Sequence, residues 1–166
     1  MDAHELMRET LNQGRRALRE PGTKPFGSLV VREGEVVGVG INRVEVDRDP
    51  TAHGEIVAIR DACHRLDTWD LSDCILFAQG EPCPLCAAAM QLAGIRELYF
   101  AADSEKATSL FAPLQGTRFA DADVPSLRAE ACLPATQGKS IRASRVMEAD
   151  AIAVYKEWLE LVRKQL

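Results

Sequence analysis

Two stretches of sequence decide the fold: Asp49-Pro50-Thr51-Ala52-His53-Gly54-Glu55 and, one predicted strand later, Glu81-Pro82-Cys83-Pro84-Leu85-Cys86. His53, Cys83 and Cys86 are three side chains of the kind that bind zinc. A structural zinc site is closed by four protein ligands, whereas a catalytic one keeps a position for water. Three ligands therefore indicate an open metal site, with Glu55 beside it as a carboxylate that need not be a ligand.

The two cysteines are spaced to share one ion. Cys83 and Cys86 are three residues apart, so on one helical turn their sulfurs lie on the same side. Pro82 and Pro84 place the pair at the start of a helix, because proline is tolerated where backbone donors have no intrahelical partner. The helix dipole favours thiolates there. Taken alone, the same spacing would also suit a redox pair in a reduced protein.

A second helix start is predicted around His53. Asp49 suits the N-cap, Pro50 suits the first helical position, and apolar residues follow at helical spacing. Residues i and i+2 of a helix point roughly opposite ways, so Glu55 should not share the face of His53. Its side chain is long enough to bend toward a metal-bound water and to carry protons.

A closed structural zinc site is an alternative for the same residues. It would need a fourth ligand, and the candidates are Cys63, His64, Cys74 and Cys132. None of these stands at a short ligand spacing from the others. A further alternative is a catalytically silent, zinc-stabilised binding protein. Glu55 argues against it, since a structural site gives no reason for a carboxylate beside the metal.

The composition limits the classes of protein to which the chain can belong. The 166 residues are 46% hydrophobic, which suits a single domain over 1–166 with a sizeable core. No apolar segment approaches the about 18 residues of a membrane span, Met1–Leu11 lacks a signal-peptide core, and the cysteine count is odd. We therefore expect a cytoplasmic protein with no membrane partner. The formal net charge of -5 argues against nucleic acid as a partner, which would need clustered Lys and Arg.

Helices and strands alternate along the chain. Periodicity and turn residues predict helices at 3–18, 50–66 and from the cysteine pair to 93, and strands at 26–31, 36–41, 74–78 and 98–101. Glu33-Gly34 is a hairpin signal between the first two strands. Strands that alternate with helices pair in parallel, so the fold class is α/β, with a helix-covered mixed sheet.

The chain beyond the last predicted strand gives weaker signals. The segment 103–126 is rich in small, polar and turn residues, and we expect either a lid or a segment exchanged with a partner chain. The stretch 149–166 is amphipathic, and its apolar side consists of Ile152, Tyr155, Trp158, Leu159 and Val162. A C-terminal helix at about 144–166 is therefore expected to dock on the core, or to pack or be exchanged in a dimer.

The order of these motifs is that of a known family. His-x-Glu followed by Pro-Cys-x-x-Cys is a zinc deaminase signature. The chain resembles the cytidine and deoxycytidylate deaminase superfamily and, within it, bacterial guanine deaminases and related nucleoside or nucleobase deaminases. The likeness runs from about Phe26 to Ala102, with a fainter echo at 155–158. Besides the two stretches quoted above, it is carried by Pro25-Phe26-Gly27, Gly40-Ile41-Asn42 and Ala58-Ile59-Arg60.

The resemblance implies a three-layer α/β/α cytidine deaminase-like fold with zinc as cofactor. By this likeness, His53, Cys83 and Cys86 would bind the ion. Glu55 would be the catalytic residue that carries protons. The resemblance also implies a homodimer that acts on a small-molecule nucleobase or nucleoside.

Substrate-binding roles also come from the resemblance. Asn42 would hydrogen-bond the base edge, Phe26 would stack on the ring, and Gly54 would offer its backbone donor. Gly54 stands where the family usually has Ala. Glycine in place of alanine lacks a methyl group and costs about 1 kcal/mol of helix propensity. Guanine deaminases carry a second acid after a phenylalanine, whereas this chain has Phe111-Ala112-Pro113. The acids available as replacements are Asp103, Glu105, Asp121 and Asp123.

The expected activity is hydrolytic removal of an exocyclic amine from a purine-type base, guanine or a close analogue, with release of ammonia. Alternatives are a nucleoside, cytosine, a pterin or a triazine as substrate. Deamination of transfer RNA adenosine uses the same kind of site but needs a basic face, and the acidic balance of the chain argues against it.

Overall fold

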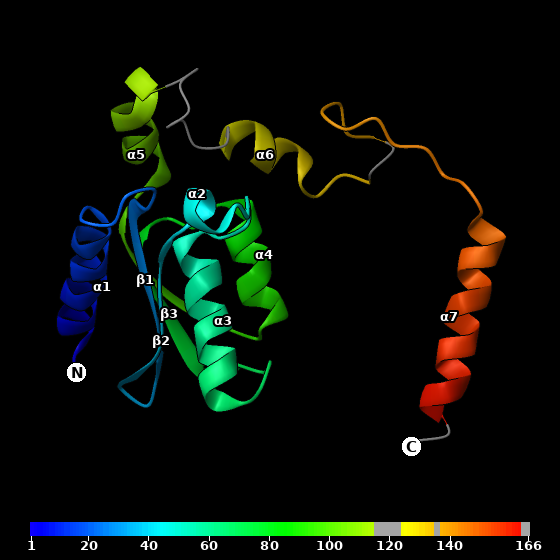
Figure 1. The fold of residues 1–166 in the computed structure, drawn as a ribbon, viewed down its shortest axis with the longest axis horizontal. Helices are drawn as coiled ribbons and strands as arrows, with labels where there is room; N and C mark the ends of the chain where they lie inside the picture. The colour runs from blue at the N-terminus through cyan, green and yellow to red at the C-terminus, as the bar shows by residue number, and fades with distance from the viewer. Residues whose placement is uncertain (115–123, 135–136, 164–166) are drawn as a thin grey trace. The chain divides into compact units, whose positions relative to one another are not determined.

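A mixed four-stranded sheet lies at the centre of the structure, a computed structural model in which residues 1–114, 124–134 and 137–163 are described (Figure 1). The strands are β1 (Lys24–Arg32), β2 (Glu35–Asn42), β3 (Cys74–Gly80) and β4 (Glu97–Ala102), in the order β2-β1-β3-β4. β1 runs antiparallel to β2 and β3, and β3 and β4 are parallel. The predicted mixed sheet and its parallel pair are confirmed.

The β1–β2 hairpin is closed by the two residues that the sequence indicated. Arg32 pairs with Glu35, and Glu33 and Gly34 between them both have positive φ, 51° and 79°. Positive φ at both central residues is the type I′ turn, whose twist matches that of the strands it joins.

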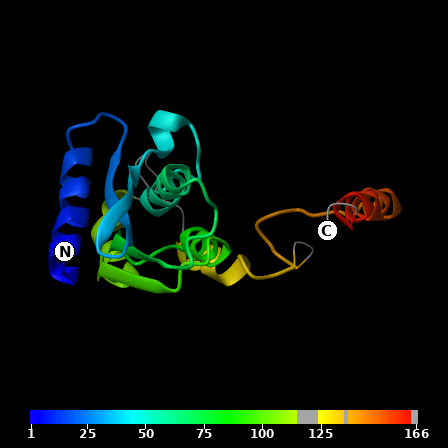
Figure 2. The same ribbon diagram turned by 90° about the horizontal axis from the view of Figure 1, so that it is seen from below.

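Helices cover both faces of the sheet. α1 (Ala3–Ala17) lies on one face, and α3 (Gly54–Leu66) and α4 (Pro84–Leu92) lie on the other (Figure 2). Neighbouring residues of β1 face opposite layers: Leu29 packs in the cluster with Leu6 of α1, whereas Val30 packs in the cluster with Ala58 of α3. This alternation buries both faces of the strand and gives the three layers that the resemblance implied.

Two glycines of β2 let the backbone of α3 pack directly against the backbone of this strand. A Cβ atom on Gly38 would lie 2.3 Å from the Ala58 carbonyl oxygen, and one on Gly40 would lie 2.1 Å from the Gly54 carbonyl oxygen. Because real Cβ atoms do not come this close to an oxygen, only glycine fits at both positions. The first turn of α3 is therefore pressed against the end of β2.

The remaining described elements are short helices and the C-terminal helix. They are α2 (Val44–Asp47), α5 (Ser104–Phe111), a 3₁₀ turn η1 (Ala112–Leu114), α6 (Val124–Glu130) and α7 (Glu148–Arg163). The segment expected to be a lid or exchanged thus begins as a helix, and residues 115–123 lie outside the described part. No helix among the described residues is long and apolar enough to cross a bilayer.

The chain divides into two compact units, Met1–Val124 and Pro125–Leu166, and the single-domain organisation stays a prediction. Within the second unit, Glu130 accepts hydrogen bonds from the backbone of Lys139 and Ser140 at 3.2 and 2.9 Å. α7 buries none of its residues. Its apolar side chains Ile152, Tyr155, Trp158 and Leu159 are between 44 and 62% exposed.

Candidate metal centre

His53 is held by a turn that precedes α3, and here the sequence-based expectation was wrong. α3 begins at Gly54 with His53 as its N-cap, not at Pro50 with Asp49 as cap. Pro50 instead occupies the second position of a turn that the Ala52 N–H closes onto the Asp49 carbonyl oxygen at 3.0 Å. Proline suits this position as well as it suits a first helical position, since both need φ near -65°.

The Asp49 carboxylate fixes this turn rather than a helix. It accepts from the Thr51 backbone N–H at 2.8 Å, from the Thr51 hydroxyl at 2.7 Å and from the Arg60 guanidinium at 3.1 Å. These hydrogen bonds, with those from Thr51 as the main cause, lower the pKa of Asp49 to about 2. Thr51 and Arg60 were quoted from the sequence only as part of the family likeness and were given no role, although Asp-Pro-Thr is a turn signal that could have identified that of Thr51.

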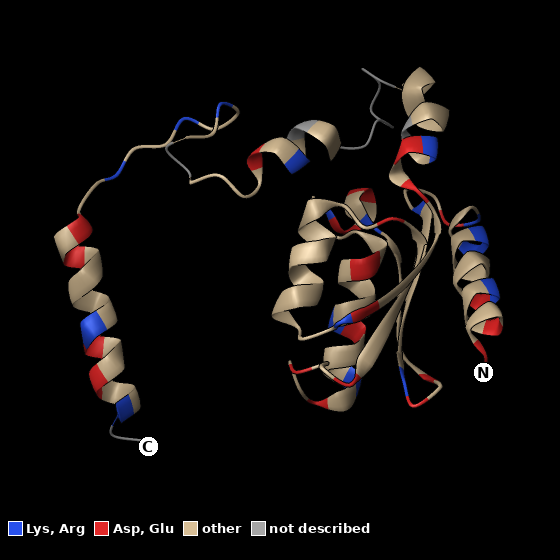
Figure 3. Ribbon diagram, turned by 180° about the vertical axis from the view of Figure 1, so that it is seen from behind, with Lys and Arg blue, Asp and Glu red and all other residues tan. Residues whose placement is uncertain are grey.

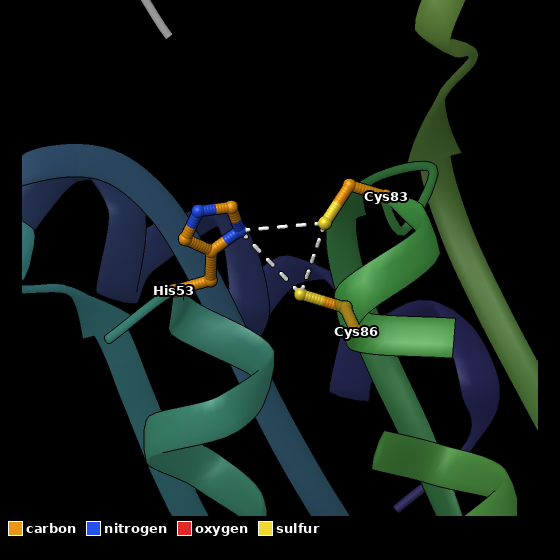
Figure 4. Close-up of side chains that lie close together, drawn as sticks. All are labelled: His53, Cys83 and Cys86. Atoms are coloured by element: carbon orange, nitrogen blue, oxygen red, sulfur yellow. Dashed lines mark hydrogen bonds between the residues drawn. The ribbon is translucent and has the colours of Figure 1, made fainter. Parts of the chain in front are cut away.

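The cysteines stand at the start of α4, as predicted. Cys83 is the N-cap, Pro84 is the first helical residue, and Cys86 lies one turn in. Both sulfurs are held in a small apolar cluster with Ile56 of α3. The two helix starts therefore converge, and His53 from one faces the two sulfurs of the other (Figure 4).

The separations of the three side chains fit a zinc ion. His53 Nδ1 lies 3.5 Å from each sulfur, and the sulfurs are 3.6 Å apart. Tetrahedral bonds of about 2.3 Å to sulfur and about 2.0–2.1 Å to nitrogen put two sulfurs about 3.8 Å apart and a sulfur and a nitrogen about 3.6 Å apart. Of the residues described, these three form the group able to hold a metal. Zinc therefore fits with a fourth position left open.

The electrostatics of the sulfur pair also suit a cation. The hydrogen bond between the sulfurs is the main cause that lowers the pKa of Cys83 to about 4 and raises that of Cys86. Zinc binds thiolates, so the lowered pKa of Cys83 suits a metal ligand. Cys63, His64, Cys74 and Cys132, the fourth-ligand candidates, lie outside the metal-competent group.

Glu55 lies beside the three ligands and is only 9% exposed. It is not a member of the metal-competent group, in keeping with a carboxylate that need not bind the ion. Burial is the main cause that raises the pKa of Glu55, while the charge of His53 acts in the opposite direction. The Glu55 carboxyl interacts with Cys86. The long side chain therefore turns toward the site although its helical position differs from that of His53.

The structure brings the three expected substrate-binding residues to the same end of the sheet. Asn42 ends β2, is buried, and accepts from the Val44 N–H at 3.3 Å. Phe26 is half-buried, and its carbonyl oxygen lies against Gly54. Gly54 is the first residue of α3, where a backbone N–H has no intrahelical partner.

The second acid of the family has no counterpart at Ala112-Pro113, which form the 3₁₀ turn. Asp103 caps α5 by accepting from the Lys106 N–H at 2.8 Å, so it serves the helix start. Glu105 is exposed. Asp121 and Asp123 lie outside the described residues.

Comparison with known proteins identifies the family. Residues 1–102 match the model described as the cytidine and deoxycytidylate deaminase zinc-binding region. The chain belongs to this family. This match and the His-Cys-Cys group together confirm zinc as the expected cofactor. The match also confirms the expected fold.

Two curated relatives differ in what their names say they act on. A guanine deaminase of Bacillus subtilis is 43% identical over 79 residues, covering 48% of this chain and 51% of that protein. A tRNA-specific adenosine deaminase of Aquifex aeolicus is 40% identical over 101 residues, covering 61% of this chain and 66% of that protein. The matches thus span about half the length of the guanine deaminase and slightly less than two thirds of the length of the tRNA-specific adenosine deaminase.

One solved structure is similar over nearly the whole chain. It is a guanine deaminase from Bacillus subtilis, with a TM-score of 0.83 and 28% sequence identity, and the match covers 96% of this chain and 95% of that one. The likeness extends beyond residue 102, where the family match ends.

Gly54→Ala tests the contact between the first turn of α3 and β1. The new Cβ would lie 2.3 Å from the Phe26 carbonyl oxygen. Overpacking costs about 1–3 kcal/mol, more than the about 1 kcal/mol by which Ala is the better helix former. We expect the free energy of unfolding in chemical denaturation to fall by up to about 2 kcal/mol, which is the overpacking cost less the gain in helix propensity. Gly80→Ala is the control, because its Cβ meets no atom within 4 Å. Equal stability of both variants would contradict this account.

Cys83→Ala tests the ligand set. Removal of a ligand should weaken zinc binding by more than about 100-fold, beyond the 10- to 100-fold effect typical of residues that only support a ligand. It should also lower the melting temperature of the zinc-loaded protein, since binding at such sites is coupled to folding. Zinc content by atomic spectroscopy and thermal denaturation measure both. Cys63→Ala, outside the group, should retain zinc; if Cys83→Ala retains it equally, Cys83 is not a ligand.

Proposed function

We propose that this protein is a zinc-dependent hydrolase that removes an exocyclic amine from a purine-type nucleobase, guanine or a close analogue, and releases ammonia. One observation supports the chemistry above all others: His53, Cys83 and Cys86 surround a position for one ion with a fourth site open, and the buried Glu55 lies beside it. An open site with a non-ligand carboxylate is the arrangement of zinc deaminases.

The residues of the site divide the work of the reaction. When bound, zinc supplies a water whose pKa falls from about 15.7 to about 7. Glu55 would move one proton from the attacking water to a ring nitrogen as the C–O bond forms, and would then move the remaining hydroxyl proton to the amine as the C–N bond breaks and the oxo group forms. Water and the amino-substituted base thus become the oxo base and ammonia.

Three other residues would hold the base. The Asn42 amide, fixed by the Val44 N–H, would hydrogen-bond its edge, and the Phe26 ring would stack on its plane. The backbone N–H of Gly54, free of an intrahelical partner, would donate to a polar atom of the substrate.

A purine base is favoured over transfer RNA by two observations. The structural likeness to a guanine deaminase covers 96% of the chain with a TM-score of 0.83, whereas the likeness to a solved tRNA:A34 deaminase structure covers 62% with a TM-score of 0.59. In addition, α1 carries Glu5 and Glu9 among its arginines, and α7 carries charges of both signs (Figure 3). Arg15 and Arg16 of α1 and Arg19 just after it lie together, but the net charge of -5 weakens the general attraction of the chain for phosphates.

Transfer RNA adenosine stays the second candidate because the Aquifex relative is 40% identical. Ammonia release from guanine, guanosine, cytosine, a pterin, a triazine and a transfer RNA anticodon stem-loop would separate these substrates. Activity on the stem-loop alone, lost as salt is raised, would replace the purine base by RNA.

Glu55→Gln tests the proton carrier. It keeps the size of the side chain but not its ability to exchange protons, so kcat should fall by about 100-fold or more while zinc content stays unchanged. Ammonia release and zinc content are measured on the same preparation. Glu45→Gln, on the exposed first turn of α2, is the matched control. Normal turnover by Glu55→Gln would remove Glu55 from the mechanism.

We also infer that α7 packs against a second copy of the chain, because the apolar side of this helix is not buried within its own unit, Pro125–Leu166. Leu159→Glu should convert a dimer to a monomer in sedimentation experiments. Ala153→Glu adds the same charge on the opposite side of α7 and should leave the dimer intact. A monomeric wild-type protein, or a dimer that tolerates both substitutions, would exclude this assembly.

A further inference from the structure

α5 connects the loop that carries the two cysteines to Phe26. At its start, the Ser104 N–H donates to the Glu81 carboxylate at 2.9 Å, and the Glu81 N–H donates to the Ala102 carbonyl oxygen at 2.8 Å. Glu81 stands two residues before Cys83, so the position of α5 is fixed by the loop that carries the cysteines. Asp103 adds an N-cap, which defines where the helix begins.

The end of α5 contacts Phe26. The Phe111 and Phe26 rings have centroids 5.7 Å apart and planes inclined at 67°, an edge-to-face contact. Aromatic rings favour this geometry because the positive edge of one ring faces the negative face of the other. The contact therefore restricts the orientation of the Phe26 ring.

Phe26 itself occupies an irregular part of β1. The register with β2 jumps between Lys24, which pairs with Asn42, and Gly27, which pairs with Ile41. Pro25 and Phe26 therefore bulge from the ladder, and bulges re-aim side chains beside functional sites. On its other side, the Phe26 carbonyl oxygen is pressed against Gly54, between His53 and Glu55.

We propose that Phe111 is a positioning residue that holds the Phe26 ring in the orientation in which it stacks on a bicyclic base, and thereby favours purines over pyrimidines. A base with two fused rings overlaps more of the Phe26 ring than a base with one ring. It therefore loses more binding when that ring is free to turn. The proposal rests on the proposed function, in which Phe26 contacts the base.

Phe111→Ala in the zinc-loaded full chain tests this proposal. We expect KM for guanine to rise by about 2- to 10-fold, the scale of an aromatic pair, and KM for cytosine to rise by less, with kcat changed by less than about 2-fold. Phe111→Tyr, which keeps the ring, should restore the wild-type values. Leu110→Ala is the matched control, because Leu110 precedes Phe111 on α5 and is 76% exposed. A fall in kcat with equal effects on both bases would overturn the proposal.

A double-mutant cycle shows whether Phe111 acts through Phe26. In a Phe26→Leu background, Phe111→Ala should no longer change KM for guanine, since the ring that it positions is gone. Additive effects of the two substitutions would contradict the proposal.

Calorimetric binding of guanine and cytosine to the same proteins separates this inference from the proposed function. Binding without ammonia release by the wild type would refute the proposed reaction and still test Phe111. Guanine binding equally tight in wild type and Phe111→Ala would refute the positioning role alone. No binding of either base to the wild type would refute both.

Discussion

The backbone contact of α3 with the sheet is the constraint on which the site depends. Gly38 and Gly40 of β2 leave room for the carbonyl oxygens of Ala58 and Gly54, so helix and strand meet without intervening side chains. Close-packed interiors resist even one added methyl group at such a contact. The start of α3 is therefore fixed against the sheet, and with it His53 and Glu55. A side chain at either glycine would push the helix outward and displace His53 with it.

The two cysteines of the candidate metal site are positioned by an independent route. β3 runs into Glu81-Pro82-Cys83, and the proline at the first position of α4 makes the helix start directly after Cys83. The two ligand-bearing helix starts have separate anchors, the Asp49 turn with Arg60 on one side and Glu81 with Ser104 on the other. Neither anchor uses the side chain of His53, Cys83 or Cys86, so both helix starts are held in place without the three candidate ligands.

Short sequence patterns were sufficient to predict most of the helices and strands. The hairpin turn at Glu33-Gly34, the helix start at Pro84 and the parallel pair of strands each follow from a pattern a few residues long. The start of α3 was misplaced because proline at 50 suits a turn and a helix start equally, and the choice depends on Asp49 binding Thr51 and Arg60. The contacts of Phe26 with Gly54 and Phe111 join distant parts of the chain and have no local pattern. They could not be predicted before α5 was placed.

Residue 102 separates the candidate metal site from a helix that contacts Phe26. The family match ends at residue 102, and all the residues proposed to bind zinc or carry protons precede it. α5 begins just beyond, and it connects the cysteine loop to Phe26 through Glu81 and Phe111. A change in α5 would therefore act on the Phe26 ring without touching the candidate ligands His53, Cys83 and Cys86. Under the proposed function, Asn42, Phe26 and Gly54 meet the base from within the family match, and α5 acts on one of them, Phe26, from outside it.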